Sequence, residues 1–154
     1  MDISDLLRPG SVIANLRMNS KKQALQELAR RAAGLTGLPE RAIFDTLWER
    51  ERLGSTGMGM GTAIPHGKIA GLTQPFGMFV RLEKPMDFEA VDEQPVDIIF
   101  VLLTPEDAGA DHLKALARIS RLFRDRAMCD KLRGTDSADA LTALLTDRAA
   151  SHAA

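Results

Sequence analysis

One segment of this chain, residues 54–67, combines unusual backbone freedom with a residue that can do chemistry. It holds five of the twelve glycines of the 154-residue sequence and ends in Ile64-Pro-His66-Gly67. The proline restricts the backbone ahead of the histidine and the glycine frees it afterwards, so we expect His66 to be presented at the end of an extended segment. A neutral imidazole is nucleophilic near neutral pH and can accept a phosphoryl group on one ring nitrogen while the other is held by a hydrogen bond. A single histidine in a loop is more often simply exposed to solvent.

A second histidine, His112, stands near the start of a strongly periodic helical segment. At about 100° per residue, Leu116, Ile119 and Phe123 fall on one side of that helix, and His112 falls on the same side. We therefore expect its ring to point toward the sheet at a helix N-terminus, where free N–H groups and the helix dipole favour an anion. The alternative is a core histidine that helps to cap the helix. The two histidines together predict a shared phosphoryl site.

Three kinds of neighbouring group could hold the same phosphate. Arg50 lies one turn before the glycine-rich segment, and its planar guanidinium could turn inward to meet the anion. Ser55 and Thr56 could donate hydroxyls, and Gly67 is a further candidate for phosphate binding. The alternatives are that Arg50 only complements the dipole at the end of a helix and that the two hydroxyls only terminate it.

The spacing of the glycines suggests a second expectation about the same segment. In an extended chain, alternate residues face opposite sides, so Gly57, Gly59 and Gly61 would share one bare face. Met58 and Met60 would then pack the opposite face into the core. Bare glycine backbone usually marks close approach by a ligand or another segment. The alternative is a glycine-rich hairpin or bulge that binds no ligand.

Nucleotide and metal sites are disfavoured. Five residues rather than four separate Gly61 from Gly67, and Ile69 stands where a phosphate-binding loop of the nucleotidase type needs Ser or Thr. The dinucleotide fingerprint cannot be laid over residues 57–67 either. A metal site made of His66, His112 and Asp111 is conceivable, but no ligand pair has the spacing of a known motif. We expect no metal and no other cofactor.

Composition limits the classes of partner. The 20 basic and 21 acidic residues give a net charge of −1, so there is no general attraction for nucleic acid or for anionic membranes. The basic helix face of Lys114, Arg118, Arg121 and Arg124 is most simply a solvated surface, and a docking patch is the minority interpretation.

Cys129 is the single cysteine, which excludes an internal disulfide and suits a reducing compartment. The N-terminus does not resemble a secretory signal, and the longest apolar run is far below the roughly 20 residues that span a membrane. We expect a cytoplasmic protein without membrane insertion.

The remaining periodicities predict the elements that must position these residues. Ser20-Lys-Lys-Gln23 has the form of a capping box, Gly34 is expected to end the helix that follows, and Pro39 suits the first turn of a second helix. Helices are expected at about residues 21–33, 39–53, 110–125 and 137–146, and strands at 11–16, 76–82 and 96–103. This order predicts an α/β fold, a three-layer α/β/α sandwich with a central mixed β-sheet. We expect one domain, residues 1–147, with a disordered tail at residues 148–154.

The run Leu53-Gly-Ser-Thr-Gly-Met-Gly-Met-Gly-Thr-Ala-Ile-Pro-His66-Gly-Lys, with Asp111-His-Leu-Lys114 later in the chain, resembles a known family. It is similar to the enzyme IIA domain of the mannitol/fructose type from the bacterial phosphoenolpyruvate-dependent phosphotransferase system. The likeness extends from about residue 4 to residue 147 and includes Gln94-Pro-Val-Asp97 ahead of a strand. Within the family, a stand-alone chain of this kind most resembles the nitrogen-regulatory branch.

The resemblance implies a set of roles. His66 would be phosphorylated by a phosphohistidine on a small phosphocarrier protein, His112 would be the second active-site histidine that steadies the phosphoryl group, and Arg50 matches the active-site arginine. No metal or nucleotide is needed in this family. The output is often regulatory, with the phosphorylation state deciding which target is bound, such as a kinase or a transporter. The chain would thus be a phosphohistidine carrier more than a turnover enzyme.

Met60 and Thr62 depart from the commoner family forms, which leaves the hydrogen bonding of the loop open. Two other functions remain as alternatives. The chain could be a sugar-transport enzyme IIA component that passes phosphate to an enzyme IIB, or a regulatory binding module that is never phosphorylated.

Overall fold

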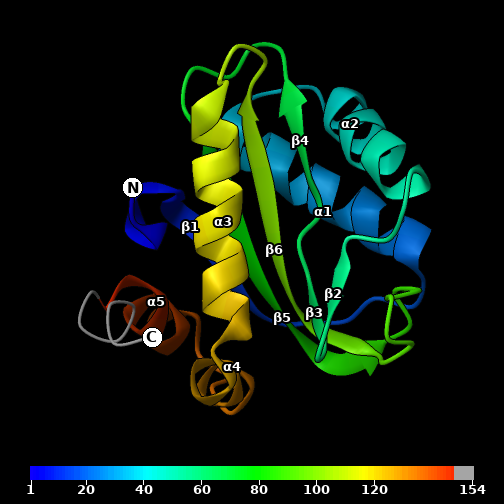
Figure 1. Cartoon of the computed structure of the whole chain (residues 1–154), viewed down its shortest axis with the longest axis vertical. Helices are drawn as coiled ribbons and strands as arrows, with labels where there is room; N and C mark the ends of the chain where they lie inside the picture. Colours follow the sequence, from blue (N-terminus) through cyan, green and yellow to red (C-terminus); the bar gives the residue numbers. More distant parts are fainter. Residues whose placement is uncertain (148–154) are drawn as a thin grey trace.

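A mixed β-sheet of six strands forms the middle of the molecule (Figure 1). The computed structural model describes residues 1–147, and the tail predicted at residues 148–154 lies outside them. The strands are β1 (Leu7–Leu16), β2 (Gly57–Gly59), β3 (Thr62–Ala63), β4 (His66–Ile69), β5 (Phe76–Met86) and β6 (Val96–Pro105). Their order is β1-β5-β6-β3-β2, and β4 also pairs with β6. β1 is parallel to β5, β3 and β4 are parallel to β6, and the β5–β6 and β2–β3 pairs are antiparallel, which confirms the predicted mixed sheet.

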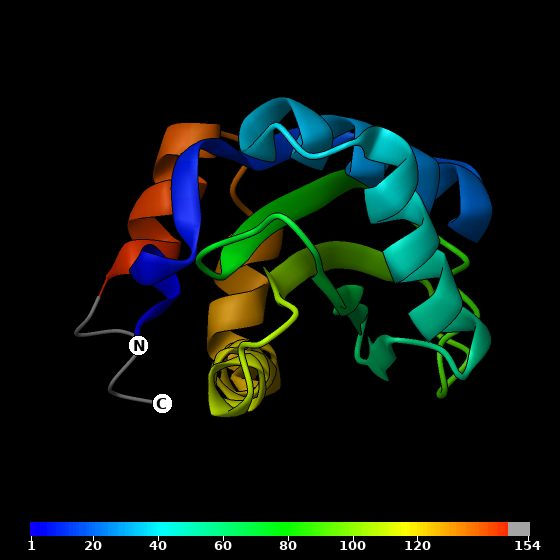
Figure 2. The same cartoon turned by 90° about the horizontal axis from the view of Figure 1, so that it is seen from above.

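Helices cover both faces of this sheet. They are α1 (Lys21–Thr36), α2 (Glu40–Arg52), α3 (Ala110–Arg124), α4 (Arg126–Arg133) and α5 (Ala138–Thr146), and a 3₁₀ turn, Ile3–Asp5, precedes β1. Figure 2 shows α1 and α2 on one side of the strands and α3 on the other. The three-layer α/β/α sandwich is therefore confirmed.

The sequence of β6 explains why this strand lies at the centre. Ile98, Phe100 and Leu102 are fully buried and pack in one cluster with residues of α3, α4 and α5. Ile99, Val101 and Leu103 are equally buried and pack with residues of α1 and α2. Because successive side chains of a strand point to opposite faces, a continuous apolar run is what a strand covered on both sides requires.

The first helix begins as predicted and ends later than predicted. Ser20 Oγ accepts the backbone N–H of Gln23 at 3.2 Å, whereas the Gln23 side chain accepts the N–H of Asn19, not that of Ser20. The expected end at Gly34 is wrong, because α1 continues through this residue to Thr36. Gly37 ends it instead, with a left-handed φ of +77°, a conformation that glycine adopts without steric cost.

The expectation of an extended glycine segment with buried methionines is also wrong. β2 and β3 form an antiparallel hairpin that turns at Met60 and Gly61, whose φ angles are +54° and +79°. Met58 and Met60 are 55% and 44% exposed. At Gly57 a Cβ atom would lie 2.7 Å from the Cβ of Ala90, so this glycine permits close packing between two segments of the chain. The alternative, a glycine-rich hairpin, describes the segment correctly.

Among residues 1–147, five elements had no counterpart in the sequence-based prediction, namely the 3₁₀ turn Ile3–Asp5, α4 and the short strands β2, β3 and β4. The short strands lie within the glycine-rich segment and just after it, where two to four residues are too few to show a periodicity. In the part of the chain that the structure describes, no helix has both the length and the apolar character needed to cross a membrane.

Candidate functional site

The fold brings the two predicted histidines together. His66 is the first residue of β4, which runs parallel to β6 with His66 opposite Leu102 and Lys68 opposite Thr104. The chain leaves β6 just beyond this point and returns as α3, whose first turn lies beside the end of β6 (Figure 1). His112 belongs to this first turn. The centroids of the two imidazole rings are 5.7 Å apart, and the ring planes are tilted by 47°.

One nitrogen of His66 is fixed by the backbone. Nδ1 lies 2.6 Å from the carbonyl oxygen of Ile64. A carbonyl oxygen can only accept a hydrogen bond, so in the neutral ring the hydrogen is on Nδ1 and the lone pair is on Nε2. Burial lowers the pKa of His66 below its ordinary value of 6.5; the Ile64 bond opposes this, and the charge of Arg50 adds to it. The ring is therefore neutral at physiological pH, with Nε2 as its nucleophilic atom.

His112 is held through its own Nδ1, which lies 2.6 Å from Oγ1 of Thr104 on β6. The ring is partly exposed, and partial burial lowers its pKa below 6.5. The nearby ring of His66 and the ammonium of Lys68 lower the pKa of His112 further, because each disfavours a second positive charge. Lys68 was not among the predicted site residues, because a single lysine two residues after His66 forms no pattern that would place it near a second ring.

Arg50 lies in the last turn of α2, close enough for its charge to act on His66. Its Nη1 donates to the carbonyl oxygen of Gly54 at 3.0 Å, a neutral acceptor that a phosphate could replace. Gly67 has a packing reason to be glycine, since a Cβ atom there would lie 2.5 Å from Cγ2 of Thr46 in α2. This close approach keeps α2, and with it Arg50, against β4.

The two predicted hydroxyls differ in their bonding. Ser55 Oγ accepts the N–H of Gly57 at 3.0 Å and lies within 3.4 Å of acceptor oxygens of Glu51 and Phe88, so it is engaged in its own loop. Thr56 Oγ1 is buried and has no hydrogen-bond partner among residues 1–147. The carbonyl of Thr56 accepts the N–H of Ile64 at 2.9 Å, which places Thr56 alongside the segment that leads to His66.

Glu51 is a residue that sequence reasoning missed, because it belongs to an alternating Glu-Arg run that is typical of an exposed helix end. It is 4% exposed, and both of its carboxylate oxygens accept the backbone N–H of Thr56. Lys21 Nζ from α1 lies 3.6 Å from the same carboxylate. The two charged groups join α1, α2 and the loop before β2.

Asp111 does not complete a metal site with the two histidines. It is exposed in the first turn of α3, and no three His, Cys, Asp or Glu side chains within residues 1–147 are grouped so that they could hold a metal ion.

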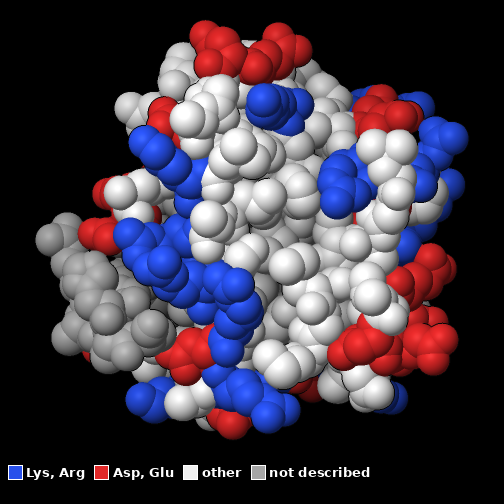
Figure 3. Space-filling model, viewed as in Figure 1, with Lys and Arg blue, Asp and Glu red and all other residues white. Residues whose placement is uncertain are grey.

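The charged surface next to the site is asymmetric. On the face that displays α3 and β4, basic side chains form a stripe along α3 and α4, and uncharged surface lies beside it (Figure 3). Within the stripe, Arg118 donates to the carbonyl oxygen of Met1 at 3.0 Å and pairs with Asp2 at 3.8 Å. Lys114, Arg121 and Arg124 are exposed, as a solvated helix face requires.

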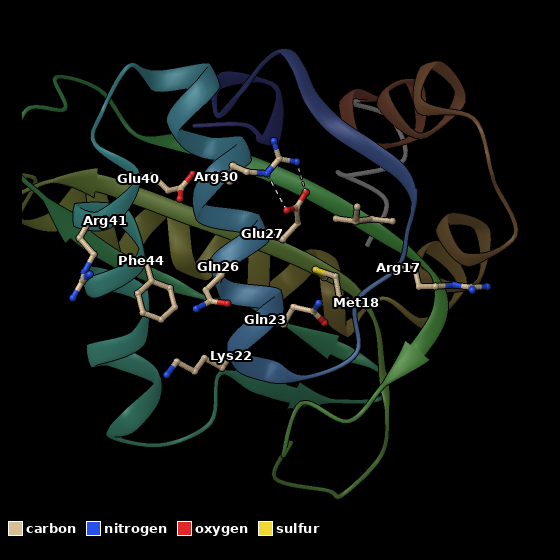
Figure 4. Close-up of a pocket in the computed structure, with 11 residues that line it drawn as sticks. Arg17, Met18, Lys22, Gln23, Gln26, Glu27, Arg30, Glu40, Arg41 and Phe44 are labelled. Atoms are coloured by element: carbon tan, nitrogen blue, oxygen red, sulfur yellow. Dashed lines mark hydrogen bonds and ion pairs between the residues drawn. The ribbon is translucent and has the colours of Figure 1, made fainter.

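A surface pocket of about 780 Å³ lies elsewhere, over α1, the start of α2 and the end of β1 (Figure 4). It is lined mainly by charged and amide side chains, with the apolar side chains of Leu16, Met18 and Phe44, and none of the predicted site residues lines it. Two of the arginines that line it already form ion pairs, since Arg30 lies 2.6 Å from Glu27 and Arg41 lies 3.1 Å from Asp45. Its size therefore does not make it the functional site.

This chain is similar to known proteins over nearly its whole length. The family model described as "Phosphoenolpyruvate-dependent sugar phosphotransferase system, EIIA 2" matches residues 5–148. The nitrogen regulatory protein of Bradyrhizobium diazoefficiens is 57% identical over 145 residues, which cover 94% of this chain and 95% of that protein. The nitrogen regulatory protein of Escherichia coli is 38% identical over 148 residues, 96% of this chain and 91% of that protein.

Solved structures show the same relationship. The crystal structure of nitrogen regulatory protein IIA-Ntr from Neisseria meningitidis superposes with a TM-score of 0.87 at 36% identity, covering 94% of this chain and 99% of that chain. IIA mannitol from Escherichia coli superposes with a TM-score of 0.75 at 15% identity over 90% of this chain and 98% of that one, a likeness of fold alone.

Proposed function

The chain belongs to the EIIA 2 family of the phosphoenolpyruvate-dependent sugar phosphotransferase system, and we propose that it is a phosphocarrier that accepts a phosphoryl group at Nε2 of His66. Its relatives include nitrogen regulatory proteins. One observation supports the proposal most directly. The Ile64 carbonyl holds Nδ1–H of His66, which leaves a lone pair on Nε2 in a partly buried ring whose partner imidazole is 5.7 Å away.

The transfer step follows from this tautomer. The lone pair of Nε2 attacks the phosphorus of a phosphohistidine on the donor protein, the donor's P–N bond breaks, and its electron pair returns to the donor nitrogen. His66 releases no proton, because the hydrogen on Nδ1 stays in place. The Ile64 carbonyl stabilises the positive charge that develops on the ring, since a hydrogen bond to a charged donor is stronger than one to a neutral donor.

Arg50 and Thr56 are the groups best suited to the phosphoryl oxygens. Arg50 can exchange its bond to the neutral Gly54 carbonyl for a bond to a dianion, which the guanidinium binds more strongly. The buried hydroxyl of Thr56 has a hydrogen to donate. Transfer between two imidazoles depends mainly on positioning and charge stabilisation, which these residues and His112 can supply without a metal.

We further propose that the phosphorylation state controls binding to regulatory targets in the cytoplasm, such as kinases or transporters. A phosphoryl group adds close to two negative charges to a surface whose neighbouring helices bear a basic stripe, which changes docking without refolding the domain. The donor would be a histidine phosphocarrier protein of the nitrogen-related branch, in keeping with relatives that are nitrogen regulatory proteins.

The experiment is phosphotransfer from labelled phosphoenolpyruvate through the first enzyme of the system and its histidine phosphocarrier. We expect an acid-labile, base-stable phosphoprotein, and no label in His66→Ala. His152→Ala is the matched control, because it removes the only other histidine besides the pair. Circular dichroism verifies that each variant is folded. Label retained by folded His66→Ala contradicts the assignment to His66, and a wild type that stays unlabelled with cognate donors contradicts the carrier function in favour of a binding module.

A further inference from the structure

Thr104 lies near the end of the central strand β6, and its hydroxyl contacts the ring of His112. Thr104 is fully buried in β6, and its Oγ1 is 2.6 Å from Nδ1 of His112. Within residues 1–147 this is the only hydrogen bond found for that hydroxyl. The contact therefore joins a rigid element of the sheet to the second ring of the site.

The contact can be made with either atom as the donor. If Nδ1–H of His112 donated to Oγ1, the hydroxyl hydrogen of Thr104 would need a second acceptor, and the described residues offer none. A buried donor without an acceptor is unfavourable, because it loses its bond to water and gains nothing in return. If the hydroxyl donates to Nδ1, both the buried hydroxyl and Nδ1 are satisfied, and the hydrogen of the neutral ring must sit on Nε2.

The two neutral rings then carry their hydrogens on different nitrogens. His66 holds its hydrogen on Nδ1 against the Ile64 carbonyl and exposes a lone pair on Nε2. His112 receives a hydrogen on Nδ1 from Thr104 and exposes an N–H on Nε2. A lone pair on Nε2 of His112 would repel phosphoryl oxygens, whereas an N–H attracts them.

We propose that Thr104 is a positioning residue that holds His112 in its Nε2–H tautomer, so that His112 donates a hydrogen bond to the phosphoryl group on His66 and does not accept that group itself. The tautomer stands on the contact between Thr104 and His112, and the part that concerns phosphate rests on the proposed function.

The tautomer is tested in the unphosphorylated protein by long-range ¹H–¹⁵N correlation of histidine side chains, at a pH above 7 where neutral rings predominate. We expect wild-type His112 to show a protonated Nε2 and an unprotonated Nδ1, and His66 to show the reverse. Thr104→Val keeps the shape of the side chain and removes the hydroxyl, so the Nε2–H population of His112 should fall, and Thr104→Ser should restore it.

Thr62→Val is the matched control, because Thr62 is also buried but donates to the carbonyl of Gly59 away from His112. It should leave the nitrogen signals of His112 unchanged. The proposal is overturned if wild-type His112 is protonated on Nδ1, or if folded Thr104→Val leaves its tautomer unchanged. The wild-type spectrum decides the tautomer even if Thr104→Val does not fold.

Phosphotransfer gives the second readout. Loss of one hydrogen bond to the phosphoryl oxygens should shorten the lifetime of phospho-His66 in Thr104→Val roughly 3- to 10-fold, with Thr104→Ser close to wild type. An unchanged lifetime in Thr104→Val overturns the positioning role even where the tautomer is as proposed. A wild type that is never labelled overturns the proposed function, and the spectra still judge the tautomer separately.

Discussion

The carboxylate of Glu51 accepts the backbone N–H of Thr56 on both of its oxygens, at 2.8 and 3.0 Å. Glu51 lies in the last turn of α2, and Thr56 lies in the loop that continues into the β2–β3 hairpin and then to His66. The side chain of Glu51 is only 2% exposed, with Lys21 Nζ 3.6 Å away. This pair therefore ties the path of the chain before His66 to the helix that bears Arg50.

Replacing Glu51 with alanine should lower the free energy of unfolding by about 3 kcal/mol, since charge-assisted bonds to a buried carboxylate are lost and the Thr56 N–H is left unpaired. Of its two ion pairs, Lys21 would keep the 2.9 Å contact with Glu89, whose side chain is 70% exposed. Urea-induced unfolding measures the change. Glu49→Ala is the control, because Glu49 is exposed and pairs at the surface with Arg52. That variant should differ from wild type by less than about 0.5 kcal/mol, and equal effects of the two substitutions would contradict the role given to Glu51.

Gly67→Ala should destabilise the protein by about 2 kcal/mol, because the new methyl group would lie 2.5 Å from Cγ2 of Thr46 and force α2 away from β4. Thr46→Ser removes that Cγ2 and retains the hydroxyl that donates to the carbonyl of Ala42 at 2.9 Å. In the double variant, much of the stability lost in Gly67→Ala should return. A double-mutant cycle of unfolding free energies measures this coupling, and purely additive effects would show that the contact with Thr46 is not what requires glycine.

Much of the fold is predictable from local pattern. The apolar run of β6 predicts a strand covered on both faces, and the periodicity of α3 predicts the side of the helix that His112 occupies, both of which the structure confirms. The proximity of His66 and His112 is predictable only by combining two features, namely a histidine at the end of the glycine-rich segment and a second histidine at the start of a helix. The structure brings the two rings within 5.7 Å.

The errors arise at residues whose surroundings are set by contacts with a distant segment of the chain. Gly57 packs against Ala90, and at Gly61 a Cβ atom would lie 2.6 Å from a guanidinium nitrogen of Arg133, contacts that no local pattern records. Met58 and Met60 were expected in the core by alternation, but the hairpin turn between β2 and β3 leaves both exposed. Glu51 was overlooked for the same reason, since its burial depends on Lys21 and on the loop that folds back over it.

Thr56→Val should separate stability from phosphate binding. Valine keeps the shape of the buried side chain and removes a hydroxyl without a partner in the described structure, so stability should stay level or rise by up to about 1 kcal/mol. If the hydroxyl donates to the phosphoryl group, the yield or lifetime of phospho-His66 should fall by up to about 10-fold.

Ser55→Ala is the contrasting variant, because Ser55 Oγ bonds within its own loop. It should lose about 1 kcal/mol of stability, measured by urea unfolding alongside phosphotransfer. Destabilisation by Thr56→Val with unchanged phosphotransfer would assign the Thr56 hydroxyl a structural role instead.

Acidification should destabilise the protein through its paired histidines. Burial lowers the pKa of both His66 and His112 below 6.5, so the unfolded chain takes up these protons at a higher pH than the folded chain does. Folding stability from this source is therefore complete above pH 6.5 and is lost as the pH falls from 6.5 toward the lowered pKa values.

Urea unfolding between about pH 8 and pH 5.5 should show this loss in wild type and a smaller loss in His66→Gln, because one of the two titrating rings is gone. Above about pH 7.5, where neither ring titrates, the two curves should run parallel. Parallel curves down to about pH 5.5 would mean that protonation of His66 is no less favourable in the fold than in the unfolded chain, contrary to its burial beside Arg50.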